Sequence, residues 1–77
     1  MTYWIKRIKL KSGEVVTERE LRQDENLFQG PAPLVGDIVR VTCRGRKFDA
    51  RVIWGNWAGR EELMKDGSVI PLRVEEV

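Results

Sequence analysis

The feature that most constrains the fold is a pair of alternating segments, 37–44 and 47–54, joined through Gly45-Arg46. Apolar residues occupy every second position in much of both segments, which is the period of a strand with one buried face. A two-residue connection that begins with glycine favours a tight hairpin turn of the mirror-image type. We therefore expect an antiparallel hairpin in which the apolar faces coincide and Arg40 lies opposite Arg51.

The N-terminal segment 3–11 has the character of another strand. It is rich in aromatic and β-branched residues, and from Ile8 onward apolar and basic residues alternate. The alternation breaks at Lys6-Arg7, so Ile5 and Ile8 can share a face only if the strand holds one extra residue. We therefore predict a β-bulge at Lys6-Arg7.

Three further segments complete the expected secondary structure. Residues 14–21 and 69–77 alternate like strands, and residues 60–66 favour a short helical turn closed by the glycine that follows. The glycine and prolines within 22–36 exclude a continuous helix there. We expect that segment to be a loop pinned to the core by Leu27-Phe28.

Five short strands in a chain of 77 residues predict a single mostly β domain. The stretch Val35-Gly36-Asp37-Ile38-Val39-Arg40-Val41 resembles the opening strand of many SH3-like barrels, including KOW and Tudor-type modules. The resemblance covers roughly residues 35–54. It implies a small five-stranded SH3-like barrel over residues 1–77, with a short helical turn before the last strand. A likeness of fold implies no particular activity.

The side-chain inventory argues against catalysis. The chain has no histidine, no phosphate-binding glycine loop and a single cysteine, Cys43, which we place on the apolar face of the hairpin. One cysteine permits neither an intramolecular disulfide nor a cysteine-cluster zinc site. We expect a non-enzymatic protein without cofactor or metal. The lone thiol, with no apolar stretch of signal-peptide or membrane-spanning length, predicts a cytoplasmic protein that does not enter a membrane.

Charge is distributed unevenly, although the net charge is only +2. Residues 1–11 carry four bases and no acid, and residues 37–60 carry six bases against two acids. A basic surface beside an exposed aromatic side chain suits nucleic acid or an acidic protein. The residues that we predict to bind such a partner are Arg40, Arg44, Arg46, Lys47 and Arg51 of the hairpin, with Trp57 in the glycine-rich loop after it.

Two alternatives stay open at this point. The hairpin could be an ordinary solvated face, and pairing of Arg40 and Arg51 with carboxylates of the same chain would remove the argument for a ligand-attracting patch. The chain could also be a structural protein that self-associates or completes a larger complex through edge strands. Among the aromatic residues, we expect Trp54 in the core and Trp4 in the core or as a cap over the barrel mouth, whereas Trp57 could stack on a ligand or fold back as a lid.

Overall fold

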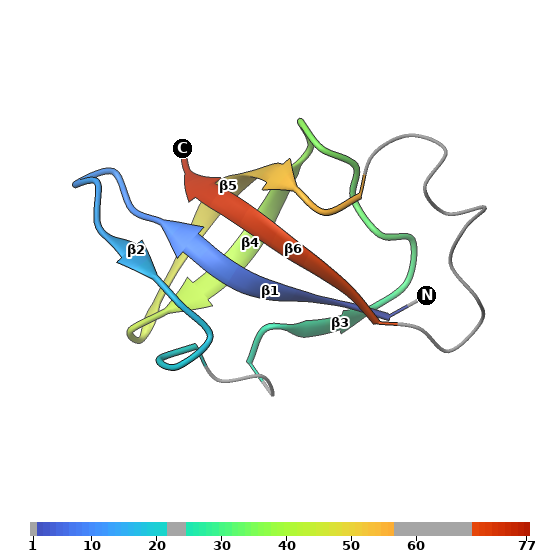
Figure 1. The fold of residues 1–77 in the computed structure, drawn as a ribbon, viewed down its shortest axis with the longest axis horizontal. Coiled ribbons are helices and arrows are strands. Elements are labelled where there is room, and N and C mark those ends of the chain that lie inside the picture. Colours follow the sequence, from blue (N-terminus) through green and yellow to red (C-terminus); the bar gives the residue numbers. More distant parts are fainter. Residues whose placement is uncertain (1, 22–24, 57–68) are drawn as a thin grey trace.

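The structure, a computed structural model, describes residues 2–21, 25–56 and 69–77 (Figure 1). Within those ranges the chain is mostly β and contains no helix. The helical turn expected at 60–66 lies outside the described residues. The strands are β1 (Thr2–Lys9), β2 (Val15–Val16), β3 (Leu27–Gln29), β4 (Ile38–Cys43), β5 (Arg46–Trp54) and β6 (Val69–Glu76).

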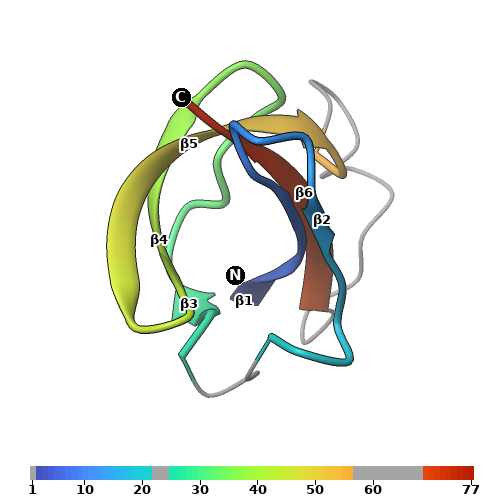
Figure 2. The ribbon, with the colours of Figure 1, turned by 90° about the vertical axis from the view of Figure 1, so that its left-hand side faces the viewer.

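The strands form one strongly curved mixed sheet in the order β2-β1-β6-β5-β4, and β3 also pairs with β1 (Figure 2). The pair β1–β6 is parallel and every other pair is antiparallel. No ladder joins β2 to β4, so the described sheet is open along a seam between them. The described residues thus contain six strands in an open sheet, where the sequence analysis expected a five-stranded barrel.

The additional strand comes from the segment expected to be a loop. β3 pairs with the start of β1, with Phe28 opposite Tyr3. The two rings stack with their centroids 5.3 Å apart, and both pack against the core. Cross-strand aromatic pairs of this kind stabilise a ladder. Anchoring to the core by Phe28 is confirmed, whereas anchoring by Leu27 is wrong because Leu27 is exposed, and the anchoring segment is a strand and not a loop.

The predicted bulge in β1 is confirmed. The register of β1 against β6 shifts between Ile5 and Arg7. The shift returns both isoleucines to the inner face, where Ile5 lies opposite Leu72 and Ile8 opposite Val74, each of the four at most 1% exposed. Because β1 and β6 lie in the middle of the sheet, these residues form the centre of the core.

The β4–β5 hairpin exists, but its register differs from the expected one by two residues. Arg40 lies opposite Asp49, and the two-residue turn is Arg44-Gly45. Both turn residues have positive φ, 52° and 79°, as a type I′ turn requires. The predicted opposition of Arg40 and Arg51 is therefore wrong, because glycine takes the second turn position here and not the first. A shift of two residues leaves the inner and outer faces unchanged.

A second bulge, which the sequence analysis did not expect, lies near the end of β5. The register against β6 shifts between Val52 and Trp54, so that Trp54 lies opposite Arg73. Val52 is fully buried, whereas Trp54 is only partly buried and turns to the outer face. The prediction that Trp54 belongs to the core is therefore wrong, because the extra residue at Ile53 reverses the phase of the strand.

Candidate functional site

The predicted hairpin patch is largely paired within the chain. The Nη1 atom of Arg40 lies 3.5 Å from Oδ1 of Asp49, and Nη1 of Arg51 lies 3.9 Å from Oε1 of Glu75. Both arginine side chains are more than half exposed, so each pair contributes little stability. Each carboxylate nevertheless offsets one positive charge on this face. The local attraction for an anion is therefore smaller than the sequence suggests.

The two cationic residues at the start of β5, Arg46 and Lys47, have different neighbours. The Arg46 guanidinium lies 5.1 Å from the centroid of the Phe48 ring and 3.9 Å from Glu76, whose other carboxylate oxygen accepts a hydrogen bond from the Lys11 amide. Lys47 is exposed and has no ion pair among the described residues. Trp57 lies outside the described residues. Among the described members of the predicted site, Arg40, Arg46 and Arg51 each have a separate carboxylate partner.

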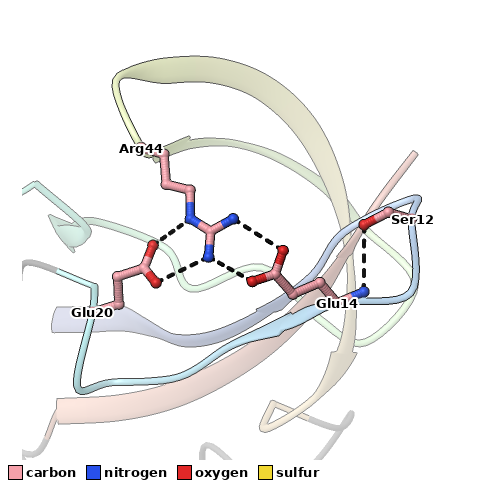
Figure 3. Close-up of polar contacts among 4 residues, drawn as sticks. All are labelled: Ser12, Glu14, Glu20 and Arg44. Carbon is pink, nitrogen blue, oxygen red and sulfur yellow. Dashed lines mark hydrogen bonds and ion pairs between the residues drawn. The ribbon is translucent and has the colours of Figure 1, made fainter.

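Arg44 joins two parts of the chain that the sheet leaves unpaired (Figure 3). Its guanidinium donates hydrogen bonds of 3.0 and 2.6 Å to the carboxylate of Glu14, directly before β2. It also donates two hydrogen bonds to Glu20, in the loop that follows β2. Because Arg44 itself lies in the β4–β5 turn, this three-residue cluster, the Arg44 clasp, spans the open seam between β2 and β4.

The electrostatics of the Arg44 clasp follow from this geometry. Hydrogen bonds from Arg44, and then its positive charge, lower the pKa of Glu14. Hydrogen bonds from Arg44 also lower the pKa of Glu20; burial opposes them, the charge of Arg44 lowers it further, and the charge of Glu14 acts in the opposite direction. The two carboxylates in turn raise the pKa of Arg44. With both forks of the guanidinium occupied, Arg44 has little capacity to bind an external anion. Its contacts are those of a structural residue.

A small groove of about 200 Å³ lies in the same seam. Thr42, Cys43, Arg44 and Gly45 line one side, and Glu20, Leu21, Glu25 and Asn26 line the other. Cys43 is buried, with 2% of the residue exposed, and burial raises the pKa of its thiol. A thiol that is shielded and held protonated is a poor nucleophile. The expected place of Cys43 on the inner face is confirmed.

A second cationic feature, which the sequence analysis did not single out, crosses three adjacent strands. Arg7 in β1 is the register partner of Arg73 in β6, and Arg73 is the partner of Trp54 in β5. The neighbouring side chains Ile8 and Val74 are buried, so these three point outward. The guanidinium carbon of Arg73 lies 4.5 Å from the centroid of the Trp54 ring. We name Arg7, Arg73 and Trp54 the outer row.

The outer row carries more positive than negative charge. Glu18 lies 3.6 Å from Nε of Arg7, a distance that suits an ion pair but is long for a hydrogen bond. The pKa of Glu18 is lowered first by a hydrogen bond from its own backbone and then by the charges of Arg7 and Lys6. Arg73 has no carboxylate partner among the described residues, and its Nε–H meets no acceptor there. Two arginine side chains therefore start from partner positions on neighbouring strands, and one carboxylate, that of Glu18, lies within 4 Å of Arg7.

An apolar strip adjoins the outer row on the same face. Trp4 is the register partner of Pro71 in β6 and of Leu27 in β3. Trp4 is half-buried and lies outside the core, and Leu27 is 40% exposed. Because Tyr3 and Ile5 on either side of Trp4 pack inward, the indole faces outward. Cationic and aromatic surfaces thus meet on the outer face of β1, β6 and β5.

Part of this arrangement has a signal in the sequence. The predicted bulge at Lys6-Arg7 turns Ile5 and Ile8 inward and agrees with an outward-facing Arg7. Trp4, predicted in the core or as a cap over the barrel mouth, is half-buried and lies outside the core. The partner of Arg7 depends on the parallel pairing of the two chain ends, and the place of Trp54 depends on the second bulge. Neither has a periodic signal, since Ile53 and Trp54 are both apolar.

Two further features concern the described ranges, 2–21, 25–56 and 69–77. No helix in them is long and apolar enough to span a bilayer. They also contain no group of three or more potential metal-binding side chains. Comparison of the chain with models of protein families, with curated proteins and with solved structures finds no match.

Proposed function

We propose that this chain is a non-catalytic, cytoplasmic binding module of the SH3-like barrel type, and that it binds nucleic acid through the outer face of β1, β6 and β5. The curved all-β sheet around one core supports the fold assignment (Figure 2). Charge and aromatic surface on one exposed face support binding.

The observation that carries the proposal is the pair of arginines on neighbouring strands. Arg7 and Arg73 are register partners, and like charges in that position destabilise a sheet. One carboxylate, that of Glu18, lies near them among the described residues. A phosphate group placed between the two guanidinium groups would relieve their repulsion and accept hydrogen bonds from both.

The predicted hairpin residues have a secondary part in this proposal. Arg40, Arg46 and Arg51 each have a carboxylate within 4 Å, so they add little local potential. Lys47 is exposed on the outer face and adds to the long-range attraction of a polyanion. An acidic protein would meet the same charges, but it offers no planar bases to the adjoining tryptophans.

The experiment is a fluorescence-anisotropy titration of labelled DNA and RNA, single- and double-stranded, at about 50 mM salt. We expect saturable binding that weakens as salt rises, because counterions are released when phosphates meet arginines. Binding that fails for all four nucleic acids would refute the proposal. If an acidic peptide of matched charge bound instead, the partner would be a protein.

A second candidate function is assembly, and one observation favours it. β4 forms the edge of the described sheet at the seam, and Ile38 at its start is 50% exposed. Ile53, on the outer face of the neighbouring strand, is 41% exposed. An edge with apolar neighbours is a surface on which another strand can pair. Light scattering from micromolar to millimolar concentration tests this candidate, and a strict monomer throughout would refute it.

A further inference from the structure

We propose that the outer row selects single-stranded over double-stranded nucleic acid, with a phosphate held between Arg7 and Arg73 and an unpaired base on the adjoining tryptophan surface. This inference rests on the proposed function and specifies the ligand that the same face binds. Three features of the outer face support it: the spacing of the two arginines, the nearness of aromatic surface to them, and the curvature of the sheet.

The spacing of the arginines suits one phosphate. Arg7 and Arg73 occupy partner positions on adjacent strands, which lie about 4.8 Å apart in a sheet. A backbone phosphodiester has two non-bridging oxygens, and each of them can accept hydrogen bonds from more than one N–H group. Two forks that start from neighbouring strands can therefore share one phosphate, with Glu18 beside Arg7 as the competing anion.

Aromatic surface lies within one nucleotide of that position. The Arg73 guanidinium is stacked on Trp54 at 4.5 Å, which fixes the cation beside the ring. Trp4 lies on the same face, one row along β1, beside the 40%-exposed Leu27. A strand whose bases are unpaired can place a phosphate on the arginines and a base on this apolar surface at once.

The curvature of the sheet disfavours a duplex. The sheet curls around its core, so the outer face is convex (Figure 2). A duplex is also convex, and its bases are stacked inside it and unavailable to a flat aromatic surface. Two convex bodies meet over a small area, so few phosphates of a duplex would reach Arg7 and Arg73 together. A flexible single strand can follow the curved face.

The test compares three labelled probes at equal salt: a single-stranded oligo(dT) of about 12 nucleotides, a duplex of equal length, and inorganic polyphosphate of similar charge. We expect the single strand to bind at least about 10-fold more tightly than either other probe, because only it adds stacking. Equal affinity for single strand and duplex would overturn this inference while leaving the proposed function intact. Failure of all three probes to bind would refute this inference, and failure of single- and double-stranded RNA as well would refute the proposed function.

Variants locate the site. Trp54→Leu should weaken oligo(dT) binding about 10-fold and leave polyphosphate binding nearly unchanged, because it removes stacking and no charge. Arg7→Gln with Arg73→Gln should lower the slope of log K against log salt by about 0.7, since the two arginines share one phosphate and each phosphate contact contributes about 0.7 on a single strand. The matched control is Arg40→Gln with Arg51→Gln, which should change the slope less. Equal losses for both pairs would overturn the assignment of the phosphate to Arg7 and Arg73. The probe comparison on the unaltered chain needs no variant to fold.

Discussion

Replacing Gly55 by alanine tests the fold that presents the outer row. Gly55 directly follows Trp54, and a Cβ atom there would lie 2.3 Å from the Pro71 carbonyl oxygen and 2.8 Å from Cδ2 of Leu72. Its φ of +127° is also one that alanine rarely adopts. The substitution therefore adds a backbone penalty and a steric clash against β6 at once.

The two contributions can be separated with a matched control. Gly30 has φ +129°, and a Cβ there would meet nothing within 4 Å, so Gly30→Ala isolates the backbone penalty of about 1–3 kcal/mol. Gly55→Ala should lower the free energy of unfolding by about 2 kcal/mol more than Gly30→Ala does, which is the typical effect of overpacking a tight contact. The total free energy of unfolding of a domain of this size is about 4–12 kcal/mol.

The assay is urea and thermal unfolding followed by far-ultraviolet circular dichroism. At about 4–8 °C per kcal/mol, Gly55→Ala should melt about 8–16 °C below Gly30→Ala. Equal melting temperatures for the two variants would refute the close approach of Gly55 to β6, and with it the second bulge that turns Trp54 outward.

Three further predictions concern the seam and the hairpin. Arg44→Asn removes the clasp while keeping a residue that tolerates positive φ, so it should destabilise the domain near neutral pH. Folding lowers the pKa values of Glu14 and Glu20, so the two carboxylates stabilise the fold at pH values above their unfolded pKa, and this stabilisation is lost as the pH falls through their folded pKa values. The difference in unfolding free energy between Arg44→Asn and the unaltered chain should therefore shrink in acid. A difference that does not change with pH would contradict the clasp. Cys43 should react slowly with a thiol reagent in the native state and fast in denaturant, whereas fast native reaction would show that the seam is open to solvent. Arg40→Ala should change stability by less than about 0.5 kcal/mol in chemical denaturation, since its pair with Asp49 is exposed, and a loss of several times that value would mean that the pair is structural.

The faces of the hairpin could be predicted from the sequence, whereas its register could not. Alternation specifies which residues point inward, and Val41, Cys43, Ala50 and Val52 are buried as expected. Register depends on which two residues form the turn, and glycine fits either position of a mirror-image turn. Placing Gly45 second puts Arg40 opposite Asp49, an attraction that the expected register lacked.

The two bulges likewise differ in whether the sequence reveals them. The one in β1 interrupts an alternation of apolar and basic residues, so the break at Lys6-Arg7 is visible in the sequence. The one in β5 lies between Val52 and Trp54, where the extra residue Ile53 is apolar like its neighbours and hides the change of phase. The outer row depends on this second bulge.

Long-range contacts were the least predictable. The Arg44 clasp joins residues 24 and 30 positions apart, and nothing in local periodicity connects Arg44 to Glu14 or Glu20. The pairing of Arg7 with Arg73 requires the parallel alignment of the two chain ends. Charge pattern alone therefore directed attention to the hairpin, where carboxylates offset most of the arginines.

The most direct test of this account is the binding of labelled oligo(dT) to two charge-matched double variants, each of which removes two arginines. The account predicts that Arg7→Gln with Arg73→Gln weakens binding at least about 10-fold, while Arg40→Gln with Arg51→Gln weakens it about 3-fold or less. Arg40 and Arg51 each have a carboxylate partner, whereas in the other pair Arg7 has Glu18 and Arg73 has no carboxylate partner among the described residues. The reverse order of these two losses would contradict the account and return the interface to the β4–β5 hairpin.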